Sequence, residues 1–405
     1  MSNQAVRILL FDTSAHALPW PLFLQDLEHL ATELPDHYAY SFVDEAAFLE
    51  PRSIVNRALT RGLDWLTINV EGRRTRRLAY ETAARFLGYR RHAVRDADLN
   101  RKLLEEARVF APELVLVVMG FHIWPRTVAA IKRETGAVIV NYATDDPFNG
   151  RTSTRDLRAA IPLYDVYACT KMATMDDVVM AGCSNVQYLR FGFQPSVHFV
   201  DPSATAEEQK RFAADVAFVG EGDADRVPFF RALMKAIPSL NLALYGGLWE
   251  LCPALRRFHR GTVRGRDFRL ALGGAKIAVN LVRVQNRDDH VMRSFEGPAC
   301  GAFMLNERTE EHLALFAEGR EAAYFESPEE LAEKVRYYLN NDSERERIRK
   351  AGHTRTITGS HTYRDRLMQI LQMVEPAVTR AAIGRVENCV RAPGRSVSRR
   401  AGRGV

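Results

Sequence analysis

The sequence predicts a two-domain α/β protein in which each domain is a doubly wound, mostly parallel sheet. The chain has 405 residues, of which 46% are apolar, so it is long enough to bury more than one core. Short apolar runs rich in β-branched residues alternate with longer segments of helical period, as in β-α-β units. Ligands of such sheets bind outside the carboxyl ends of the strands, so functional residues are expected just after strands.

The expected strands fall into two sets. The first set comprises VRILLF (6–11), YSFV (40–43), WLTIN (65–69), LVLVVM (114–119), AVIVN (137–141), VYACT (166–170) and NVQYL (185–189). The second set comprises DVAFVG (215–220), LALYG (242–246), IAVNL (277–281), AFMLN (302–306) and AAYF (322–325). Between them, residues 191–209 lack a sustained period and contain Pro195 and Pro202, which makes this segment the expected linker.

Helix signals are clearest near the end of the body. Ser327 with Glu330 is typical of a capping box, and Ser343 with Glu346 is expected to start the next helix, which Gly352 would end. A last helical run at roughly 361–375 has an apolar stripe that requires a partner surface. The stripe consists of Leu367, Ile370, Leu371 and Val374.

The net charge of +6 lies in the last thirty residues. Residues 376–405 contain seven arginines and the single Glu387, so residues 1–375 are neutral by the same count. The tail is rich in Gly, Ser and Pro and is predicted to be disordered, with a weak contact to an anionic membrane surface as the functional alternative. The neutral body carries no nucleic-acid signature, and no nucleic-acid partner is expected.

Cellular context and redox state are expectations from composition. The start, MSNQAVRILLF, shows no signal-peptide architecture, and no apolar run is long enough to span a bilayer. The expected location is cytoplasmic, with the inner face of the membrane as a peripheral alternative. The five cysteines are far apart and show no C-x-x-C spacing, so free thiols are expected rather than disulfides or a zinc site.

The strongest constellation of polar residues is HVMRSFEGPACGAFML, residues 290–305. An anion is favoured near a helix start, and Arg293 can clamp a phosphate, while Glu296 has two acceptor oxygens suited to vicinal sugar hydroxyls. Pro298 fits the first turn of a short helix, and Gly301 could end that helix before a strand. Nucleotide-sugar binding would use all of these features, but a surface ion pair is the simpler explanation of an isolated Arg and Glu.

The segment from about 273 to 367 resembles the C-terminal half of the CgeB-like group-1 glycosyltransferases, named for a spore maturation protein. The resemblance lies in HxxRxFExxAcG, then LFAEGREAAYFESPEELAEKVRYYL, RERIRKAG and HTYRDRL, in consistent order. More loosely, PELVLVVMGFHIWP, AVIVNYATDDPFN, LYDVYACTK and LRFGFQPSVH are similar to segments of the N-terminal half. The resemblance implies a GT-B fold, a nucleotide-sugar donor held mainly by the second domain and an acceptor held mainly by the first.

The resemblance also implies domain limits. The expected units are residues 1–195 for the acceptor domain, 196–360 for the donor domain and 361–380 for a helix that crosses back to bridge the two, with residues 381–405 as the disordered tail. The bridging helix is expected because the chain end commonly packs on the N-terminal domain in GT-B enzymes of this type.

For the donor side, the resemblance assigns the ribose to Glu296, with His290 and Arg293 in the positions that precede it. Retaining relatives have a glutamate near the donor sugar where this chain has the shorter Asp288. Gly220 matches a glycine turn whose backbone can approach a phosphate, but Glu221 replaces the arginine that many relatives have next, so Arg226 is the candidate positive group. Further donor contacts are expected, against the alternative of plain strand-end turns, from Tyr245, Gly246 and Asn280, with Gly301 closing the motif.

For the acceptor side, His122 follows the 114–119 run, near where related enzymes place a histidine. Asp145 and Asp146 follow the next strand, where Pro147 turns the chain. A carboxylate there could act as a general base, and loop capping is the alternative. The predicted catalytic residues are therefore His122, Asp146 and Asp288, while His198 in the linker is either structural or reaches the cleft.

The sequence thus predicts a GT-B glycosyltransferase that moves a sugar from a nucleotide-diphosphate donor to a hydroxyl acceptor, with no cofactor and no bound metal. The Asp-x-Asp pairs at 96–98 and 223–225 do not follow clear strands in a single-domain layout, which disfavours a metal-dependent GT-A enzyme. Inversion and retention both stay open. The alternatives are a nucleotide-sugar epimerase of the same fold and a coat or envelope assembly protein that kept the fold as a scaffold.

Overall fold

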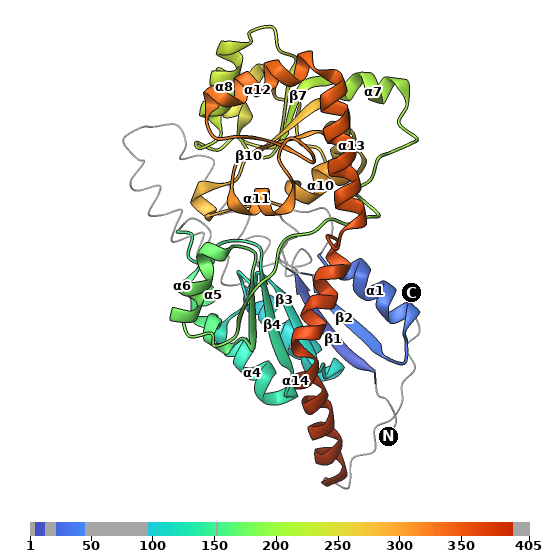
Figure 1. The fold of residues 1–405 in the computed structure, drawn as a ribbon. Helices are drawn as coiled ribbons and strands as arrows, with labels where there is room; N and C mark the ends of the chain where they lie inside the picture. Colours follow the sequence, from blue (N-terminus) through green and yellow to red (C-terminus); the bar gives the residue numbers. More distant parts are fainter. Residues whose placement is uncertain (1–4, 13–21, 45–95, 151–152, 392–405) are drawn as a thin grey trace, which may run out of the picture.

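The computed structural model describes residues 5–12, 22–44, 96–150 and 153–391, with side chains up to residue 378. The expected strand at 65–69 and the end of the predicted tail, residues 392–405, lie outside the described residues. Two parallel sheets with helices on both faces form two Rossmann-like domains, the first below the second in Figure 1. The predicted GT-B architecture of two doubly wound domains is confirmed.

The first domain is built on a sheet with strand order β2-β1-β3-β4-β5-β6, and its described pairings are all parallel. Leu10 of β1 lies between Phe42 of β2 and Leu116 of β3. In chain order the elements are β1 (Val6–Asp12), α1 (Leu24–Glu33), β2 (Tyr38–Asp44), β3 (Leu114–Val118), α4 (Pro125–Thr135), β4 (Val138–Ala143), α5 (Arg155–Ala160), β5 (Val166–Cys169), α6 (Met175–Met180) and β6 (Val186–Tyr188). Residues 96–110 are helical and lead into β3.

The second domain has strand order β11-β10-β9-β7-β8, again with parallel pairings. Its elements are α7 (Ala206–Phe212), β7 (Ala214–Val219), α8 (Val227–Ala236), β8 (Leu242–Tyr245), α9 (Gly265–Gly273), β9 (Ala275–Asn280), α10 (Arg293–Ala299), β10 (Met304–Glu307), α11 (Glu310–Leu315), β11 (Ala323–Phe325), α12 (Pro328–Asn340) and α13 (Asp342–Thr358). The predicted boundary at 195 and 196 therefore lies between β6 and α7.

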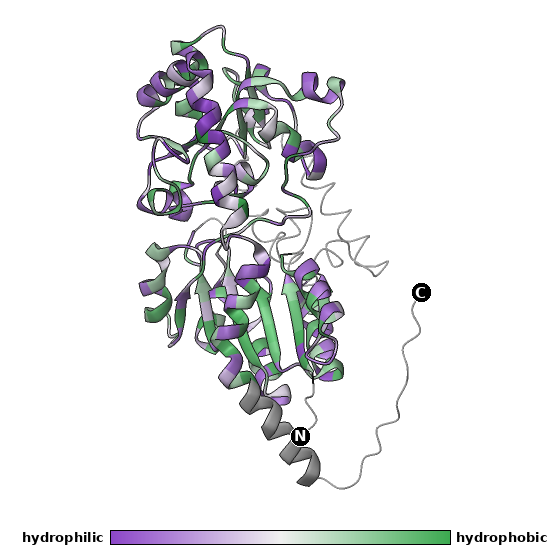
Figure 2. Cartoon of the chain, turned by 45° about the vertical axis from the view of Figure 1, so that its right-hand side comes forward, coloured by the Kyte–Doolittle hydropathy of each residue, from purple (hydrophilic) through white to green (hydrophobic). Residues whose placement is uncertain are grey.

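Both faces of each sheet are buried, because helices cover them on both sides. In β3, Leu114, Leu116 and Val118 face one core cluster while Val115 and Val117 face another, as the two-residue period of a strand requires. Figure 2 shows the strands of the first sheet as largely hydrophobic. This burial on both faces explains why the strands appear in the sequence as continuous apolar runs.

Helix α14 (Tyr363–Arg391) returns the chain to the first domain, where it lies along the lower sheet (Figure 1). Leu367, Ile370 and Val374 are buried in the cluster that contains Ile8 and Leu116. Where the chain crosses, the Phe193 N–H donates to the His361 carbonyl at 3.0 Å, and the Tyr363 N–H donates to the Phe193 carbonyl at 3.1 Å. Two segments of chain thus pass side by side between the domains.

Two details differ from the sequence predictions. Helix α14 continues to Arg391, past residue 380, where the disordered tail was predicted to begin. Gly352 does not end a helix but lies buried inside α13. A Cβ at this position would collide with the carbonyl of Glu321, so glycine is needed for the close packing. A glycine at a close backbone contact resembles a helix stop in sequence, although here it allows α13 to approach its neighbour.

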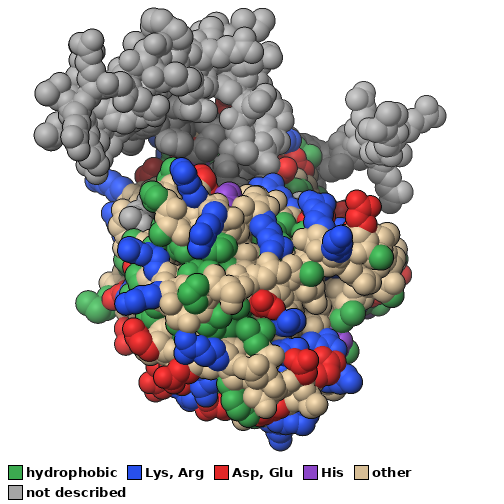
Figure 3. Space-filling model, turned by 90° about the horizontal axis from the view of Figure 1, so that it is seen from above, with side chains coloured by type: hydrophobic (Ala, Val, Ile, Leu, Met, Phe, Trp, Pro, Cys, Tyr) green, Lys and Arg blue, Asp and Glu red, His purple; other side chains and the backbone are tan. Residues whose placement is uncertain are grey.

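Three further observations concern the charged surface, the cysteines and the helices. Figure 3 shows Lys and Arg side chains interspersed with Asp and Glu on the face seen from above. Cys169, Cys183, Cys252 and Cys300 are free. In the described part of the chain, no helix combines the length and the apolar character that crossing a membrane requires.

Candidate functional site at the domain interface

The carboxyl ends of β7 and β8 meet in a tight backbone contact. Gly246 has φ of 118°, and a Cβ on it would collide with the carbonyl of Gly220, so only glycine fits there. The Gly220 N–H donates to the Tyr245 carbonyl at 2.8 Å, and the Gly220 carbonyl accepts from the Trp249 indole at 2.8 Å. The Tyr245 side chain is buried and packs near Phe212 in the core. These predicted donor residues therefore shape the strand ends.

Arg226, the residue predicted to bind a phosphate, lies close to Gly220 at the end of β7. Its guanidinium donates to the carbonyls of Glu221 and Leu281, at 3.3 and 3.2 Å, and lies 3.6 Å from Asp223. The residue is 3% exposed, and burial lowers its pKa to about 10. Arg226 Nε has no hydrogen-bond partner among the described residues. Arg226 thus ties β7 to β9, a structural task that the sequence did not predict.

Asn280 at the end of β9 is also used by the fold. Its amide nitrogen donates to Asn306 Oδ1 at 3.0 Å and lies 3.2 Å from Ser294 Oγ. Ser294 in turn contacts His312 Nε2 at 2.7 Å. This buried network fixes the start of α10 against β9 and β10, so Asn280 supports the donor motif from below.

The connection between β9 and α10 reaches across to the first domain. Arg287 makes a bidentate ion pair with Asp146, at 2.7 and 2.9 Å, and a further contact of 2.6 Å with Asp177. The hydrogen bonds to Asp146 raise the pKa of Arg287. Asn286 accepts from the Asp146 N–H at 2.9 Å and donates to Asp145 at 3.0 Å. Asp146 therefore helps to hold the domains together, because Arg287 engages both of its carboxylate oxygens. Its role as a general base stays a prediction.

Asp288 pairs with a buried lysine of the first domain. Lys171 Nζ lies 3.1 Å from Asp288 Oδ1 and donates to the Thr144 carbonyl at 2.8 Å. The side chains are 1% and 6% exposed. Burial raises the pKa of Asp288, and Lys171 opposes that rise. Asn286 donates to the same carboxylate at 2.9 Å, so Asp288 is well satisfied by protein groups.

His290 is fully buried between the domains. Its Nε2 accepts from the Phe191 N–H at 3.2 Å, which places the ring proton on Nδ1, and Nδ1 lies 2.9 Å from Asp289. Both ring nitrogens are thus committed to protein contacts. In the structure His290 links the donor motif to the linker, and its predicted donor role stays a prediction.

Glu296 differs from all of these residues. It lies in the first turn of α10 and is 2% exposed, yet Oε2 has no hydrogen-bond partner among the described residues. Arg293 Nη1 is 4.0 Å from Oε2, and His198 Nε2 is 3.6 Å from Oε1. Burial raises the pKa of Glu296 to about 7, while the charge of Arg293 lowers it. A buried carboxylate oxygen without a partner is costly, and such an atom is suited to receive a ligand hydroxyl.

Gly301 lies at the opposite end of α10. Its φ is 76°, and its N–H donates to the Pro298 carbonyl at 3.0 Å, as in a glycine that ends a helix. The Gly301 carbonyl accepts from Arg349 at 2.9 Å. Gly301 thus ends α10 on the side opposite Arg293, and its predicted donor contact stays a prediction.

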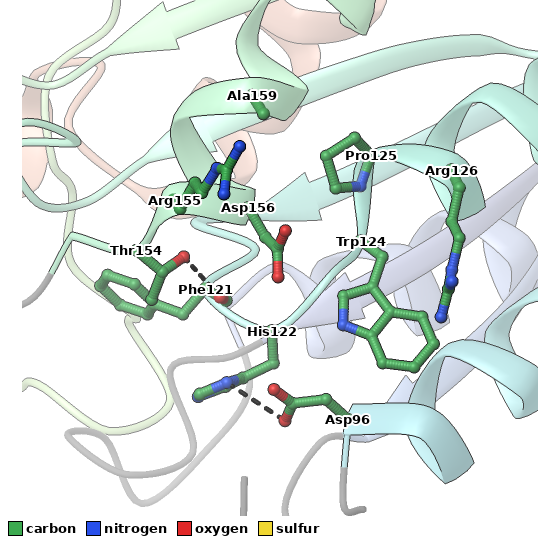
Figure 4. A pocket seen from close by; sticks show the side chains of 10 residues that line it. All are labelled: Asp96, Phe121, His122, Trp124, Pro125, Arg126, Thr154, Arg155, Asp156 and Ala159. Carbon is green, nitrogen blue, oxygen red and sulfur yellow. Dashed lines mark hydrogen bonds and ion pairs between the residues drawn. The ribbon is translucent and has the colours of Figure 1, made fainter. Parts of the chain in front are cut away.

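His122 lies in a separate pocket of the first domain with a volume of about 1040 Å³ (Figure 4). Its Nδ1 is 3.3 Å from Asp96 Oδ1, drawn as a dashed line in Figure 4. An imidazole within reach of a carboxylate is a common arrangement for general acid–base chemistry. The other lining residues are Phe121, Trp124, Pro125, Arg126, Thr154, Arg155, Asp156 and Ala159.

The sequence missed three residues that contact across the domains: Lys171, Asn286 and Arg287. Lys171 follows the end of β5, so its position after a strand was the available signal. Arg287 has φ of 50°, a conformation that no sequence pattern around it indicates. Among the described residues, no group of three His, Cys, Asp or Glu is arranged to hold a metal ion.

Comparison with known proteins adds a family match and several similar structures. The model of a family described as "glycosyl transferase-like" matches residues 226–372. HepE from Anabaena, crystallised with UDP-glucose, superposes with a TM-score of 0.59 at 13% identity, covering 91% of this chain and 99% of that one. Sucrose-phosphate synthase from Thermosynechococcus elongatus gives 0.59 at 11% identity, with 92% and 99% covered. A glycosyltransferase from Rickettsia africae gives 0.54 at 9% identity, with 92% and 98% covered.

A search of curated protein sequences gives no match to this chain. At such low identities the structural likeness concerns the fold alone. Within it, the matched segment contains Arg293 and Glu296 together with Asp288 and Asn280. The chain therefore has the GT-B fold, and its residues 226–372 match the glycosyl transferase-like family model.

Proposed function

We propose that this protein transfers a sugar from a nucleotide-diphosphate donor to a hydroxyl acceptor, and that within the glycosyltransferases it is CgeB-like. The observation that carries the proposal is Glu296, a buried carboxylate with an unused oxygen beside Arg293. Both residues lie in the segment that matches the glycosyl transferase-like family. Vicinal ribose hydroxyls can satisfy both carboxylate oxygens, and Arg293 can bind the diphosphate.

The donor complex would use the groups that the fold leaves available. The Arg293 side chain is 27% exposed, so it can bind a diphosphate where it stands, without a conformational change that would first expose it. Negative charge grows on the departing diphosphate in the transition state, and an oriented guanidinium stabilises that charge. We propose no resident metal for this step, and Arg293 takes the role for which Arg226 is too deeply enclosed.

The acceptor would bind in the pocket shown in Figure 4. Phe121 and Trp124 supply flat apolar surface there, and His122 with Asp96 supplies a base. In an inverting reaction His122 would remove the proton of the acceptor hydroxyl. In a retaining reaction the leaving diphosphate can accept that proton. Determining the anomeric configuration of the product by NMR separates the two courses.

The first test is nucleotide binding by the full chain. A thermal-shift screen with UDP, GDP, TDP and CMP should find at least one stabilising ligand, because a ligand of the native state raises the melting temperature. Glu296→Ala should weaken binding of that nucleotide by about 1 to 3 kcal/mol through loss of charge-assisted hydrogen bonds. Glu333→Ala on α12, an exposed glutamate of the same domain, is the matched control and should bind as wild type.

Two outcomes would contradict the proposal. If none of the four nucleotides binds, the chain has the fold of these enzymes without the function, as expected of a scaffold protein. If an epimer of the donor sugar appears in the absence of any acceptor, the enzyme is a nucleotide-sugar epimerase. Unchanged affinity in a folded Glu296→Ala variant would remove Glu296 from the donor site.

A further inference from the structure

His198 lies at the end of the linker turn between the domains, and it faces the candidate donor carboxylate. The residue is 1% exposed, and its ring packs edge-on against Phe268 at a centroid distance of 5.6 Å. The Gln194 carbonyl accepts from the His198 N–H at 2.8 Å, which closes the turn. The Gln194 side chain contacts Asp26 of the first domain at 3.3 Å. The ring is thus held by packing and by a turn anchored to the other domain.

The backbone sets the tautomer of this histidine. The Gln194 N–H donates to His198 Nδ1 at 3.0 Å, so Nδ1 is the acceptor and the proton lies on Nε2. Burial, with the nearby charges of Arg293 and Arg269, lowers the pKa of His198 to about 3. The side chain is therefore a neutral N–H donor over the ordinary pH range.

The Nε2–H group of His198 points toward Glu296. Nε2 lies 3.6 Å from Glu296 Oε1, which is slightly beyond hydrogen-bond distance. Contacts in an active site often shorten when the substrate is bound. A neutral N–H at this position favours the ionised form of the carboxylate, and only that form can accept two hydroxyl hydrogen bonds through both oxygens.

We infer that His198 is a positioning residue that orients Glu296 through its Nε2–H, so that the carboxylate is ready to receive the ribose of the donor. The inference rests on the proposed function for the role of Glu296 but not for the contact itself. It also makes the linker part of the donor site, because the same turn that connects the domains sets the direction of the carboxylate.

Other titratable groups also face Glu296. Arg293 precedes it on α10, Cys300 follows it at the end of α10, and Tyr363 approaches from the start of α14. Arg293 is the cation among them. Its charge acts on Glu296 in every variant below, so a difference between variants of His198 reports the histidine contact.

The contact is tested by titrating Glu296 directly. Carboxyl carbon signals of labelled glutamate are followed by NMR against pH, and the Glu296 signal is assigned by its loss in Glu296→Gln. His198→Phe keeps the ring shape without the N–H, and the Glu296 pKa should rise. His198→Gln keeps an N–H donor and should leave the titration close to that of wild type. If His198→Phe does not fold, His198→Leu gives the same comparison.

Binding of the nucleotide found in the screen supplies the second readout. His198→Phe should weaken binding about tenfold, as for the loss of one hydrogen bond to a charged group, and His198→Gln should restore most of the affinity. His353→Phe is the matched control, because His353 contacts the Pro298 carbonyl of α10 at 2.8 Å, and in the described part of the chain the only hydrogen bond of its side chain is this one.

The two proposals fail in different ways. An unchanged Glu296 titration in His198→Phe overturns the role of His198, whether or not a nucleotide binds. Absence of nucleotide binding by wild type overturns the proposed function, while the titration still decides the contact. Equal nucleotide affinity in His198→Phe and wild type also overturns the inference.

Discussion

Asp288 and Glu296 lie eight positions apart in one segment of the second domain, and both carboxylates are buried. Asp288 has Lys171 at 3.1 Å and Asn286 at 2.9 Å. Glu296 has His198 at 3.6 Å and Arg293 at 4.0 Å, with no hydrogen-bond partner for Oε2 in the described part of the chain. Two carboxylates are thus buried to a similar degree, but protein groups supply hydrogen bonds to Asp288, whereas one oxygen of Glu296 lacks them.

This difference between the two carboxylates indicates two roles within the segment from the end of β9 to the first turn of α10. The part before α10 contacts the first domain through Asn286, Arg287 and Asp288, so its polar groups contribute to domain association. In the first turn of α10, Glu296 Oε2 has no hydrogen-bond partner among the described residues, which is the basis for proposing a ligand there. Changes at Asp288 should therefore affect stability first, and changes at Glu296 should affect binding first.

The largest effect is expected from breaking the buried ion pair. Lys171→Met leaves Asp288 buried beside an apolar side chain, and the free energy of unfolding should fall by about 3 to 5 kcal/mol. Adding Asp288→Asn removes the unpaired charge and should restore most of this loss. Urea denaturation of the single and double variants measures both steps.

The control is an exposed ion pair of the same domain. Lys276 lies 2.9 Å from Asp215, with side chains 53% and 26% exposed, so Lys276→Met should cost at most about 1 kcal/mol. If Lys171→Met costs no more than Lys276→Met, Asp288 is not held as the structure shows, and the contrast with Glu296 is lost.

A smaller effect, with a distinctive pH dependence, is expected at Glu296. Burial raises its pKa from 4.5 to about 7, so between these values the folded chain binds more protons than the unfolded chain. The free energy of unfolding therefore falls as the pH rises through this window. Glu296→Gln cannot titrate, so its stability relative to wild type should increase with pH by up to about 3 kcal/mol.

Denaturation curves of the two proteins between pH 4.5 and pH 7.5 give this difference. Groups present in both proteins, such as Asp26, whose pKa burial raises to about 6, cancel in the comparison. A difference that stays constant with pH would mean that the pKa of Glu296 is the same in the folded and the unfolded chain, and the carboxylate would not be left incomplete. Nucleotide binding by Glu296→Gln should be weakened in either case.

The fold was accessible to sequence reasoning because its signals are local. Strands such as β3 and β4, which are buried throughout, coincide with continuous apolar runs, since burial on both faces favours apolar residues. The strands β2 and β6 at the ends of the first sheet are only partly buried. Gly352 was misjudged because a glycine that permits close packing and a glycine that ends a helix look alike in sequence. The end of α14 was missed because its last turns contain the arginines and small residues that also mark a disordered tail.

The site was less accessible, because it depends on how the two domains face each other. The sequence identified Glu296 and Arg293 through the spacing of their motif. In the structure Glu296 Oε2 has no hydrogen-bond partner among the described residues, and the Arg293 side chain is 27% exposed. The same motif contains His290, which the fold uses against the Phe191 backbone of the linker. Asp146 follows a strand as a catalytic residue would, but its partner Arg287 comes from the other domain, and no local pattern links the two.

The smallest effect on stability is expected at Arg293, where the comparison is sharpest. Arg293 is partly exposed and lies 4.0 Å from Glu296, whereas Lys171 is buried and in direct contact with Asp288. Arg293→Met should therefore change the free energy of unfolding by less than about 1 kcal/mol at neutral pH.

Loss of the Arg293 charge should raise the pKa of Glu296, because Arg293 opposes the effect of burial. The pH window in which the free energy of unfolding declines should therefore extend upward. Arg293→Lys should retain the wild-type window, and Arg293→Met in the Glu296→Gln background should show no pH dependence of its own. If the window does not move in Arg293→Met, the two side chains are independent, and Glu296 would have to bind its ligand without help from the arginine that precedes it.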